Sequence, residues 1–510
     1  METESNVLFL LSFIVLIINS LTDAQSRPNI VFVLTDDQDI KLGGMTPMVK
    51  TNNLVGDKGI KFNNMFTTSP LCCPSRSSIL TGRYVHNHGA VNNSLDGGCS
   101  NDKWQQDQEA NAFPTVLKTK GYSTFFAGKY LNQYGYPQSG GVEHVPPGWD
   151  DWNGLVGNSQ YYDYSLSVNG QQVKHGHEYP QDYLTDVIHK AARKFLTTRD
   201  KKKPFFMMLS TPACHAPFTP APQYNSSFSD KLAPRDGSYN QQAGPDKHWL
   251  IRQAAVPMPS DTVQQSDSFF QNRWRTLQSV DDMMEDLVQT LQADGLLDNT
   301  YIFFSSDNGY HLGQFGLPYD KRQLYDFDIR VPLMVRGPGI KPNQTSDKIV
   351  ANIDLAPTFL DLVDGTILPN VDGISLKPYL HPSDNSTRPL RDYILIEHTG
   401  EYSERVDSCP QFLGQDMSNC NNHCVCEDSK NNTFACIVQV QSGHMIKACE
   451  LMDSENFVEI YDTTADPYEF KNLYKTYDPK SFAVLQKQLQ FLSTCKGPEC
   501  NSLPQAVRGV

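Results

Sequence analysis

Short apolar runs alternate with stretches of helical pattern over residues 25–380 of the chain. The runs at 30–34, 205–210 and 300–306 have the length and composition of buried strands, and the segment 113–130 predicts a helix, a glycine turn and a further strand. Helices are expected at 182–199, at about 268–293, and again in the segment NIDLAPTFLDLVDG. Strands that alternate with helices predict an α/β fold, with a large, mostly parallel central sheet flanked by helices.

The pattern changes beyond about residue 380, where the elements become shorter and cysteines become frequent. Residues 381–510 therefore predict a smaller C-terminal α+β domain, which closes with a helix at 479–494. In an oxidising compartment this cysteine density is typical of a disulfide-bonded region, whose pairing the sequence leaves open. A zinc site is the weaker alternative, because the spacing of Cys420, His423, Cys424 and Cys426 does not fit a common finger. The cysteines after residue 400 are Cys409, Cys420, Cys424, Cys426, Cys436, Cys449, Cys495 and Cys500.

The amino-terminal segment has the pattern of a secretory leader. Residues 7–18 are apolar, too few for a membrane span of ~20 residues, and cleavage is expected after Ala24, so that residues 1–24 form a signal peptide. The preceding METESN is atypical, because it contains no Lys or Arg, and an uncleaved anchor is the alternative. Export fits five possible N-glycosylation sites. These begin at Asn92, Asn225, Asn343, Asn385 and Asn431.

The composition narrows the range of possible functions. The chain has 510 residues and a formal net charge of −14, which argues against a general nucleic-acid-binding protein. An acidic protein can still hold a local basic site for an anionic substrate, so the net charge decides little about small ligands.

Polar side chains follow two of the expected strands. Asp36 and Asp37 follow the first, and Asp307 and Asn308 follow the strand at 300–306. Ligand sites of open α/β sheets lie at the carboxyl ends of the strands, so these side chains are expected to converge. Short oxygen-bearing side chains suit a hard cation such as Ca²⁺, whereas each pair alone would read equally well as a turn or a helix cap.

The stretch LCCPSRSSILTGRY, residues 71–84, has the pattern of a helix start, with Pro74 expected at the first helical position. Free N–H groups at a helix N-terminus favour an anion, and Arg76, Lys129 and Lys321 could add cationic donors. Two histidines in polar loops, His215 and His311, are candidate proton donors or anion contacts.

The string Cys72-Cys73-Pro74-Ser75-Arg76, followed by LTGR, resembles the C-x-P-S-R signature of the type I sulfatases. The segments with Asp36-Asp37-Gln38, GYSTFFAGKY, PACHAP and SSDNGYHLGQ extend the resemblance over residues 28 to about 380. It implies the alkaline-phosphatase-like sulfatase fold. Within the family, CCPSR, GKYLNQYG and DKRQLYDFDIRVPLMVRGPG look most like the N-acetylglucosamine-6-sulfatases. The extracellular heparan endosulfatases share many of these sequence segments but carry a long basic insertion that is not found here.

The resemblance implies that Cys72 is converted to formylglycine by the formylglycine-generating enzyme. A hydrated aldehyde offers two hydroxyls on one carbon, of which one attacks the sulfur of a sulfate ester and the other later expels sulfate. One Ca²⁺ would be held by Asp36, Asp37, Asp307 and Asn308 together with the modified residue at position 72. Arg76, Lys129, His215 and Lys321 match family positions that hold the aldehyde hydrate or the sulfate, and His311 is a candidate general acid or sulfate contact.

The chain departs from many arylsulfatases in one place. They continue the lysine loop as G-K-W-H, whereas Lys129-Tyr130 is followed here by Leu131-Asn132. Either Asn132 or His311 takes over the role of the missing histidine, or the subgroup manages without it. Conversion of Cys72 would also leave eleven sulfurs, an odd number, so that Cys73 or Cys214 is expected to stay unpaired.

The expected activity is hydrolysis of sulfate esters on glycosaminoglycans, namely the 6-O-sulfate of N-acetylglucosamine in heparan or keratan sulfate. The lysosome is the expected compartment and secretion the alternative; a homodimer is possible, and no stable membrane anchor is expected. Competing interpretations are an endosulfatase or arylsulfatase with another substrate, a phosphatase or phosphonate monoester hydrolase of the same broad fold, and an inactive protein that binds sulfated glycans.

Overall fold

The computed structural model describes residues 27–507, except residues 236, 367, 369, 383–390, 402–426 and 428. A 10-stranded sheet forms the centre of the molecule, in the order β10-β2-β9-β8-β1-β7-β3-β4-β5-β6. Its strands are β1 Asn29–Thr35, β2 Ile60–Phe66, β3 Ser123–Lys129, β4 Asp151–Leu155, β5 Ser165–Val168, β6 Gln171–Lys174, β7 Phe205–Ser210, β8 Thr300–Ser306, β9 Leu333–Arg336 and β10 Gln344–Ala351.

The predicted mostly parallel sheet is confirmed in its central part. β8, β1, β7, β3 and β4 are parallel neighbours, and β10 pairs in parallel with β2. β9 runs antiparallel between β2 and β8, and β5 and β6 add an antiparallel ribbon at the other edge. The carboxyl ends of the five central strands therefore meet at one edge, where sequence-distant loops come together.

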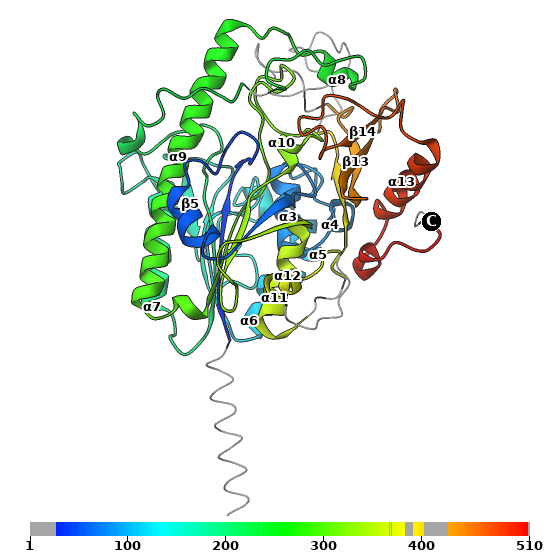
Figure 1. Ribbon diagram of the computed structural model, residues 1–510. Coiled ribbons are helices and arrows are strands. Elements are labelled where there is room, and N and C mark those ends of the chain that lie inside the picture. Colours follow the sequence, from blue (N-terminus) through cyan, green and yellow to red (C-terminus); the bar gives the residue numbers. More distant parts are fainter. Residues whose placement is uncertain are drawn as a thin grey trace, which may run out of the picture.

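Helices cover both faces of this sheet (Figure 1). The long helix α9 and α7 pack on one face, and α3, α6 and α11 pack on the other. β1 shows why both faces are apolar, since Ile30 and Phe32 face the α11 side while Val31 and Val33 face α9. The helices are α2 Val49–Thr51, α3 Cys72–Thr81, α4 Val85–His88, α5 Asp102–Asp107, α6 Phe113–Thr119, α7 Leu184–Thr198, α8 Trp249–Arg252, α9 Ser260–Ala293, α10 Asp326–Ile329, α11 Leu355–Asp364, α12 Lys377–Leu380 and α13 Pro479–Leu492.

The helix expected at 268–293 begins eight residues earlier, because Pro259 precedes it and the amphipathic pattern continues back to Ser260. The helices expected at 182–199 and 479–494 agree with α7 and α13 to within two residues at each end.

A smaller antiparallel sheet follows the large one, as the change of pattern near residue 380 predicted. Its strands lie in the order β11-β12-β13-β14, and α13 packs on it (Figure 1). A disulfide joins Cys436 to Cys449 across β12 and β13, and a second joins Cys495 to Cys500. These strands are β11 Tyr393–His398, β12 Phe434–Gln441, β13 His444–Leu451 and β14 Val458–Asp462.

Several sequence predictions lie outside the described residues. They are the signal peptide at 1–24, the sequon at Asn385, and Cys409, Cys420, Cys424 and Cys426 with the alternative zinc site. Within the part of the chain that is described, no helix is long and apolar enough to cross a membrane.

Candidate active site

The carboxyl ends of β1 and β8 lie side by side, because the two strands pair in parallel along their whole length. The acids that follow β1 therefore meet those that follow β8, as the sequence predicted. The backbone N–H of Asp37 donates to Asp307 Oδ1 at 3.0 Å, and Asn308 Nδ2 donates to Asp37 Oδ1 at 2.7 Å. These three side chains and Asp36 are all buried.

Helix α3 brings Cys72 to this acidic group. Leu71 is extended and precedes the helix, so that Cys72 is its first residue and Pro74 its third. The expectation of Pro74 at the first helical position was therefore wrong by two residues. Proline is tolerated there because N–H groups of the first helical turn have no acceptor within the helix.

The thiol of Cys72 faces two carboxylates. Its Sγ lies 3.7 Å from Asp36 Oδ1 and 3.9 Å from Asp37 Oδ1. Burial raises the pKa of the Cys72 thiol to about 12. An unmodified Cys72 would therefore stay protonated and be a weak nucleophile, because the reactive form of cysteine is the thiolate.

Two lysines neutralise the acids after β1. Lys129, at the end of β3, places Nζ at 3.1 and 2.8 Å from the two oxygens of Asp36. Lys321 places Nζ at 2.7 Å from both oxygens of Asp37. Both lysine side chains are almost fully buried, so each ammonium group is held by the site.

Arg76 connects four segments of the site. Its Nε donates to Asp307 Oδ2 at 2.8 Å, and its Nη2 lies 3.5 Å from Asp36 Oδ1. Nη1 donates to the backbone oxygen of Lys129 at 2.8 Å and to Ser210 Oγ at 2.7 Å. The guanidinium is thus fixed by partners on the β8, β1, β3 and β7 loops.

The surrounding charges give Asp36 and Asp307 opposite pKa shifts. Burial raises the pKa of Asp36, but the combined charges of Lys129, His215 and Arg76 outweigh it and hold this pKa well below its usual range. For Asp307 burial prevails and raises the pKa to about 7.

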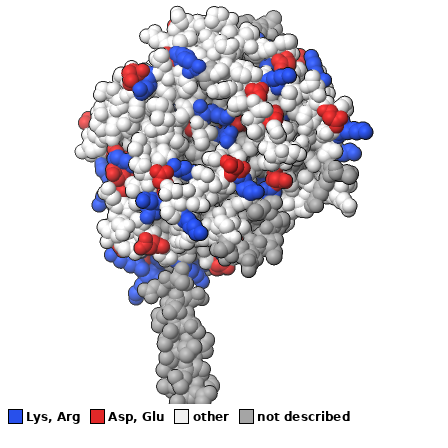
Figure 2. Space-filling model, in the orientation of Figure 1, with Lys and Arg blue, Asp and Glu red and all other residues white. Residues whose placement is uncertain are grey.

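The charged groups of the site are internal, with Asp36, Asp37 and Asp307 matched by Arg76, Lys129 and Lys321. In contrast, the surface drawn in Figure 2 carries blue and red side chains interspersed. The positive charge that an anionic ligand needs is therefore concentrated at the carboxyl edge of the sheet. It is not spread over the surface that Figure 2 shows. A divalent cation would give the site an excess positive charge.

His215 lies at the mouth of the site. Its Nε2 is 3.9 Å from Asp37 Oδ2, and its Nδ1 donates to the backbone oxygen of Ala216 at 2.6 Å. The side chain is 14% exposed, whereas the other charged groups of the site are almost fully buried. Burial lowers the pKa of His215 from its ordinary value.

The structure does not bring His311 to this group. Its Nδ1 lies 3.0 Å from Asp328 Oδ1 and its Nε2 lies 3.1 Å from Glu427 Oε1, so both ring nitrogens are engaged. Burial alone would lower the pKa of His311, but these two carboxylates outweigh it and raise the pKa to about 10. A buried imidazolium held on both sides is not placed to contact a sulfate at Cys72.

Leu131 stands where G-K-W-H has its histidine, and Asn132 is the next residue. It is buried, and its Nδ2 donates to Asn158 Oδ1 at 3.2 Å. Its Oδ1 has no hydrogen-bond partner within the described chain. Of the two residues that could take over that role, Asn132 alone keeps a free polar atom.

Three contacts of the site were missed at the sequence level. Ser159 Oγ donates to Asp36, and Ser210 Oγ accepts a hydrogen bond from Arg76. Both serines lie at or beyond the carboxyl end of a strand, where ligand sites of α/β sheets are expected, so the sequence could have indicated them. Arg273, in the middle of α9, donates from Nη2 to the backbone oxygen of Asp37 at 2.8 Å. Nothing in the local sequence distinguishes this arginine from a surface residue.

The donor atoms fit a metal ion. Single donor atoms of Asp36, Asp37, Cys72 and His215 all lie within 4.8 Å of one another. Asn308 Oδ1 is buried and has no hydrogen-bond partner in the described part of the chain, although its Nδ2 is fully used. A buried carbonyl oxygen without a donor is costly unless a cation binds it, and an oxygen-rich donor set favours Ca²⁺ or Mg²⁺.

Of the cysteines near the site, one pair forms a disulfide and two cysteines are free, in line with the odd number of sulfurs. Cys73 forms a disulfide with Cys99, which ties the start of α3 to the loop before α5. Cys72 and Cys214 are free and buried. Cys214 is therefore the unpaired residue of the two candidates.

Known proteins resemble this chain both in fold and in sequence. A solved structure described as a complex with its substrate D-glucosamine-2-N,6-O-disulfate has the same fold, with a TM-score of 0.71 at 24% identity over 92% of this chain and 97% of the other. The Sulfatase family model matches residues 28–366, which include every site residue named above except Glu427.

The chain belongs to the sulfatase family and is a sulfuric ester hydrolase. It is 52% identical over 479 residues to the N-acetylglucosamine-6-sulfatase of Homo sapiens, covering 93% of this chain and 86% of that protein. It is 42% identical to the extracellular sulfatase SULF-1 homolog of Drosophila melanogaster, covering 75% of this chain but 34% of that protein.

Proposed function

We propose that the protein removes the 6-O-sulfate of N-acetylglucosamine residues in heparan or keratan sulfate. The observation that carries this proposal is the 52% identity to N-acetylglucosamine-6-sulfatases over 93% of the chain. The buried convergence of Cys72, Lys129 and Lys321 on the acids after β1 supplies the matching chemistry. We further propose that the protein works in the secretory pathway, in the lysosome.

Position 72 is proposed to carry formylglycine, formed by the formylglycine-generating enzyme. The supporting observation is the Cys72 thiol itself, which burial keeps protonated and which has no disulfide partner. A hydrated aldehyde at this position would present hydroxyl groups at the N-terminus of α3, next to Asp36 and Asp37.

The metal is proposed to be one Ca²⁺. Asp36, Asp37, Asp307 and Asn308 would hold it together with the modified residue 72, and when bound it would polarise the sulfate oxygens and neutralise their charge. Lys129, Lys321 and Arg76 fix the geometry of these carboxylates and add positive charge around the sulfate. Preorganised cations of this kind stabilise charge that develops during transfer.

His215 is proposed to contact the sulfate or the departing sugar oxygen. It is the site histidine at the mouth, and its Nδ1 is held by the neighbouring backbone, which leaves Nε2 directed to the acids. A protonated Nε2 can donate a hydrogen bond to an anionic ligand, or a proton to the leaving alcohol.

The test is sulfate release by the purified protein from defined oligosaccharides carrying either a terminal 6-O-sulfated N-acetylglucosamine or a 2-O-sulfated uronic acid, between about pH 4 and pH 8. Release from the first alone, with an acidic optimum, is expected. Release from internal residues at neutral pH would instead assign endosulfatase activity. Glycan binding without any sulfate release would overturn the proposal.

A further inference from the structure

Lys321 reaches Asp37 from a segment without regular secondary structure. It lies in the connection between β8 and α10, and residues 312–325 of this connection form neither a helix nor a strand. Lys129, the other lysine of the site, is the last residue of β3, where pairing with β4 holds its backbone. The position of Lys321 must therefore be set by contacts other than those of the sheet.

The backbone directly after Lys321 adopts an unusual conformation. Arg322 has a φ of 94°. Residues with a Cβ rarely occupy this left-handed region, because Cβ then crowds the neighbouring backbone. Such a conformation costs free energy and persists only where surrounding contacts hold it. The contacts of Arg322 therefore identify what fixes the segment that carries Lys321.

The side chain of Arg322 joins its own loop to the C-terminal domain. Its Nη1 donates to Asp320 Oδ2 at 2.6 Å, and its Nε donates to Glu401 Oε2 at 2.5 Å. The side chain of Arg322 is 13% exposed and that of Glu401 is 5% exposed, so their ion pair is largely shielded from water. Charge-assisted hydrogen bonds of this kind are stronger than those between neutral groups. Glu401 therefore fixes the side chain that follows Lys321.

A second residue of the C-terminal domain holds the backbone of Arg322. Asn432 Nδ2 donates to the backbone oxygen of Arg322 at 2.9 Å and to that of Glu427 at 3.0 Å. Asn432 is buried and lies two residues before β12, whereas Glu401 lies three residues after β11. Because β11 and β12 pair antiparallel, the end of the first and the start of the second lie together. Both contacts to Arg322 therefore come from one corner of the C-terminal sheet.

Glu427 adds a contact on the far side of Arg322. Its Oε2 accepts a hydrogen bond from Gln323 Nε2 at 2.8 Å, and its Oε1 lies 3.1 Å from His311 Nε2. The backbone N–H of His311 in turn donates to the backbone oxygen of Asp320 at 2.9 Å. The residues on both sides of Lys321 are thus held by the same group of contacts.

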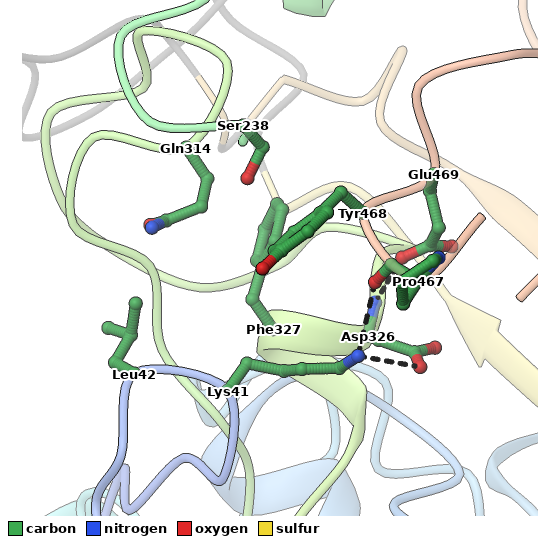
Figure 3. Close-up of a pocket in the computed structure, with 9 residues that line it drawn as sticks. All are labelled: Lys41, Leu42, Ser238, Gln314, Asp326, Phe327, Pro467, Tyr468 and Glu469. Carbon is green, nitrogen blue, oxygen red and sulfur yellow. Dashed lines mark hydrogen bonds and ion pairs between the residues drawn. The ribbon is translucent and has the colours of Figure 1, made fainter. Parts of the chain in front are cut away.

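The C-terminal domain also packs closely on the loop that follows β1. Figure 3 shows Lys41 of this loop, whose Nζ donates to the backbone oxygen of Pro467 at 3.1 Å and lies 3.7 Å from Asp326 Oδ2. The buried Lys447 forms ion pairs with Asp326 and Glu469. The cavity between these residues measures about 20 Å³, room for one water molecule. The interface is therefore tight enough to transmit the position of the C-terminal domain to the loops of the active site.

We propose that Glu401 and Asn432 are positioning residues for Lys321, which hold its ammonium group on Asp37 and against the sulfate. They act through Arg322, whose side chain is bound by Glu401 and whose backbone oxygen is bound by Asn432. The proposal rests on the proposed function, since the contact of Lys321 with the sulfate is assigned there. It gives the smaller domain a part in catalysis, because the irregular loop alone does not fix Lys321.

The test is a double-mutant cycle on sulfate release from two substrates, 6-O-sulfated N-acetylglucosamine and an aryl sulfate. Glu401→Ala and Asn432→Ala should each lower kcat/KM about 5- to 20-fold on both substrates, because both carry the sulfate that Lys321 contacts. Lys321→Ala should lower kcat/KM about 10²- to 10³-fold, as when one preorganised donor is removed. In the Lys321→Ala background, Glu401→Ala and Asn432→Ala should each change kcat/KM less than about twofold, since residues that act through one group are not additive.

Glu401→Gln is the conservative variant. It keeps an oxygen that can accept from Arg322 Nε, so its kcat/KM should lie between the values of Glu401→Ala and of the wild-type protein. Glu397→Ala is the matched control, since Glu397 forms an ion pair that joins the same two domains at His86 instead of at the loop of Lys321. It should leave kcat/KM within about twofold of the wild-type value.

A loss of equal size in the wild-type and Lys321→Ala backgrounds would overturn the proposal, because Glu401 and Asn432 would then act on the fold or on another group. So would unchanged kcat/KM in both single variants, or an equal loss in Glu397→Ala. Sulfate release by the wild-type protein from the aryl sulfate but not from the sugar would instead contradict the proposed function. The cycle on the aryl sulfate would then still test the positioning of Lys321.

Discussion

The group around Asp37 and the group formed by His311, Asp328 and Glu427 are both buried, and only two residues separate Asn308 of the first from His311 of the second. Both contain acids and a histidine, and both bring donor atoms within reach of a metal. In the first group Asn308 Oδ1 lacks a donor. In the second, the two carboxylates lie at opposite nitrogens of the His311 ring.

The difference shows that residue type does not identify a reactive cluster. An ion bound by all three residues of the His311 group would have to displace the imidazole from one of its two carboxylates, because they approach it from opposite sides. The Asp37 group, in contrast, presents an unused oxygen and the free thiol of Cys72 on one side. An unsatisfied oxygen therefore distinguishes the proposed active site from the His311 group.

Replacement of Cys72 should give the largest effect in the comparison. Cys72→Ala is expected to lower sulfate release at least about 10⁴-fold, the range seen when a covalent nucleophile is removed. Cys214→Ala is the matched control, since Cys214 is also free and buried, and it should retain activity within about tenfold. In the wild-type protein, mass spectrometry of the peptide with residue 72 should show loss of sulfur and two hydrogens and gain of one oxygen. An unmodified Cys72 in fully active protein would contradict the proposed nucleophile.

Removal of His311 should affect stability more than chemistry. His311→Ala leaves Asp328 and Glu427 buried without their partner, which should cost about 3–5 kcal/mol of unfolding free energy, the range for a broken buried ion pair. Denaturant unfolding measures this loss. At a temperature where the variant is folded, kcat should stay within severalfold of the wild-type value. A large fall in kcat with unchanged stability would restore the predicted role of His311 as a general acid.

Removal of Asn308 Oδ1, the buried oxygen without a hydrogen-bond donor, should weaken metal binding. Asn308→Ala is expected to lower Ca²⁺ affinity about tenfold or more, because one oxygen ligand is lost from a site with few alternatives. Titration calorimetry on the chelator-treated protein measures the affinity, and added Ca²⁺ should restore activity to both the wild-type protein and the variant. Unchanged affinity would show that Asn308 is not a ligand.

The smallest effect concerns His86, a partly buried counterpart of His311 that joins the large sheet to the C-terminal sheet. Its Nδ1 lies 2.8 Å from Glu397 Oε1 on β11. Burial alone would lower the pKa of His86, but Glu397 outweighs it and raises the pKa. The contribution to stability is therefore fully present below the unfolded pKa of about 6.5 and is lost as pH rises through the raised folded pKa.

The measurement for His86 is thermal unfolding of the wild-type protein and of His86→Gln between about pH 5 and pH 8. The variant should lose less than about 1 kcal/mol, as for partly exposed ion pairs, and only at the acidic end. An equal loss at both ends of the range would show that the charge of His86 makes no contribution.

The sequence predicted the central parallel strands well because they are short apolar runs, and two of them, β1 and β8, are followed by acids. It also placed Asp36, Asp37, Asp307 and Asn308 together, since parallel strands end at one edge of a sheet. His311 was misplaced as a site contact for a different reason. Its partners Asp328 and Glu427 lie 17 and 116 residues further along the chain, beyond any local pattern.

The sequence by itself determined the family and predicted the proposed nucleophile position and the acids, because each is carried by a short motif that can be read locally. Only the tertiary structure decided which polar atoms remain unsatisfied and which cysteine stays free. It also decided that Arg273 donates to the backbone oxygen of Asp37. These properties depend on the partners that other segments supply, and burial makes the presence or absence of each partner costly.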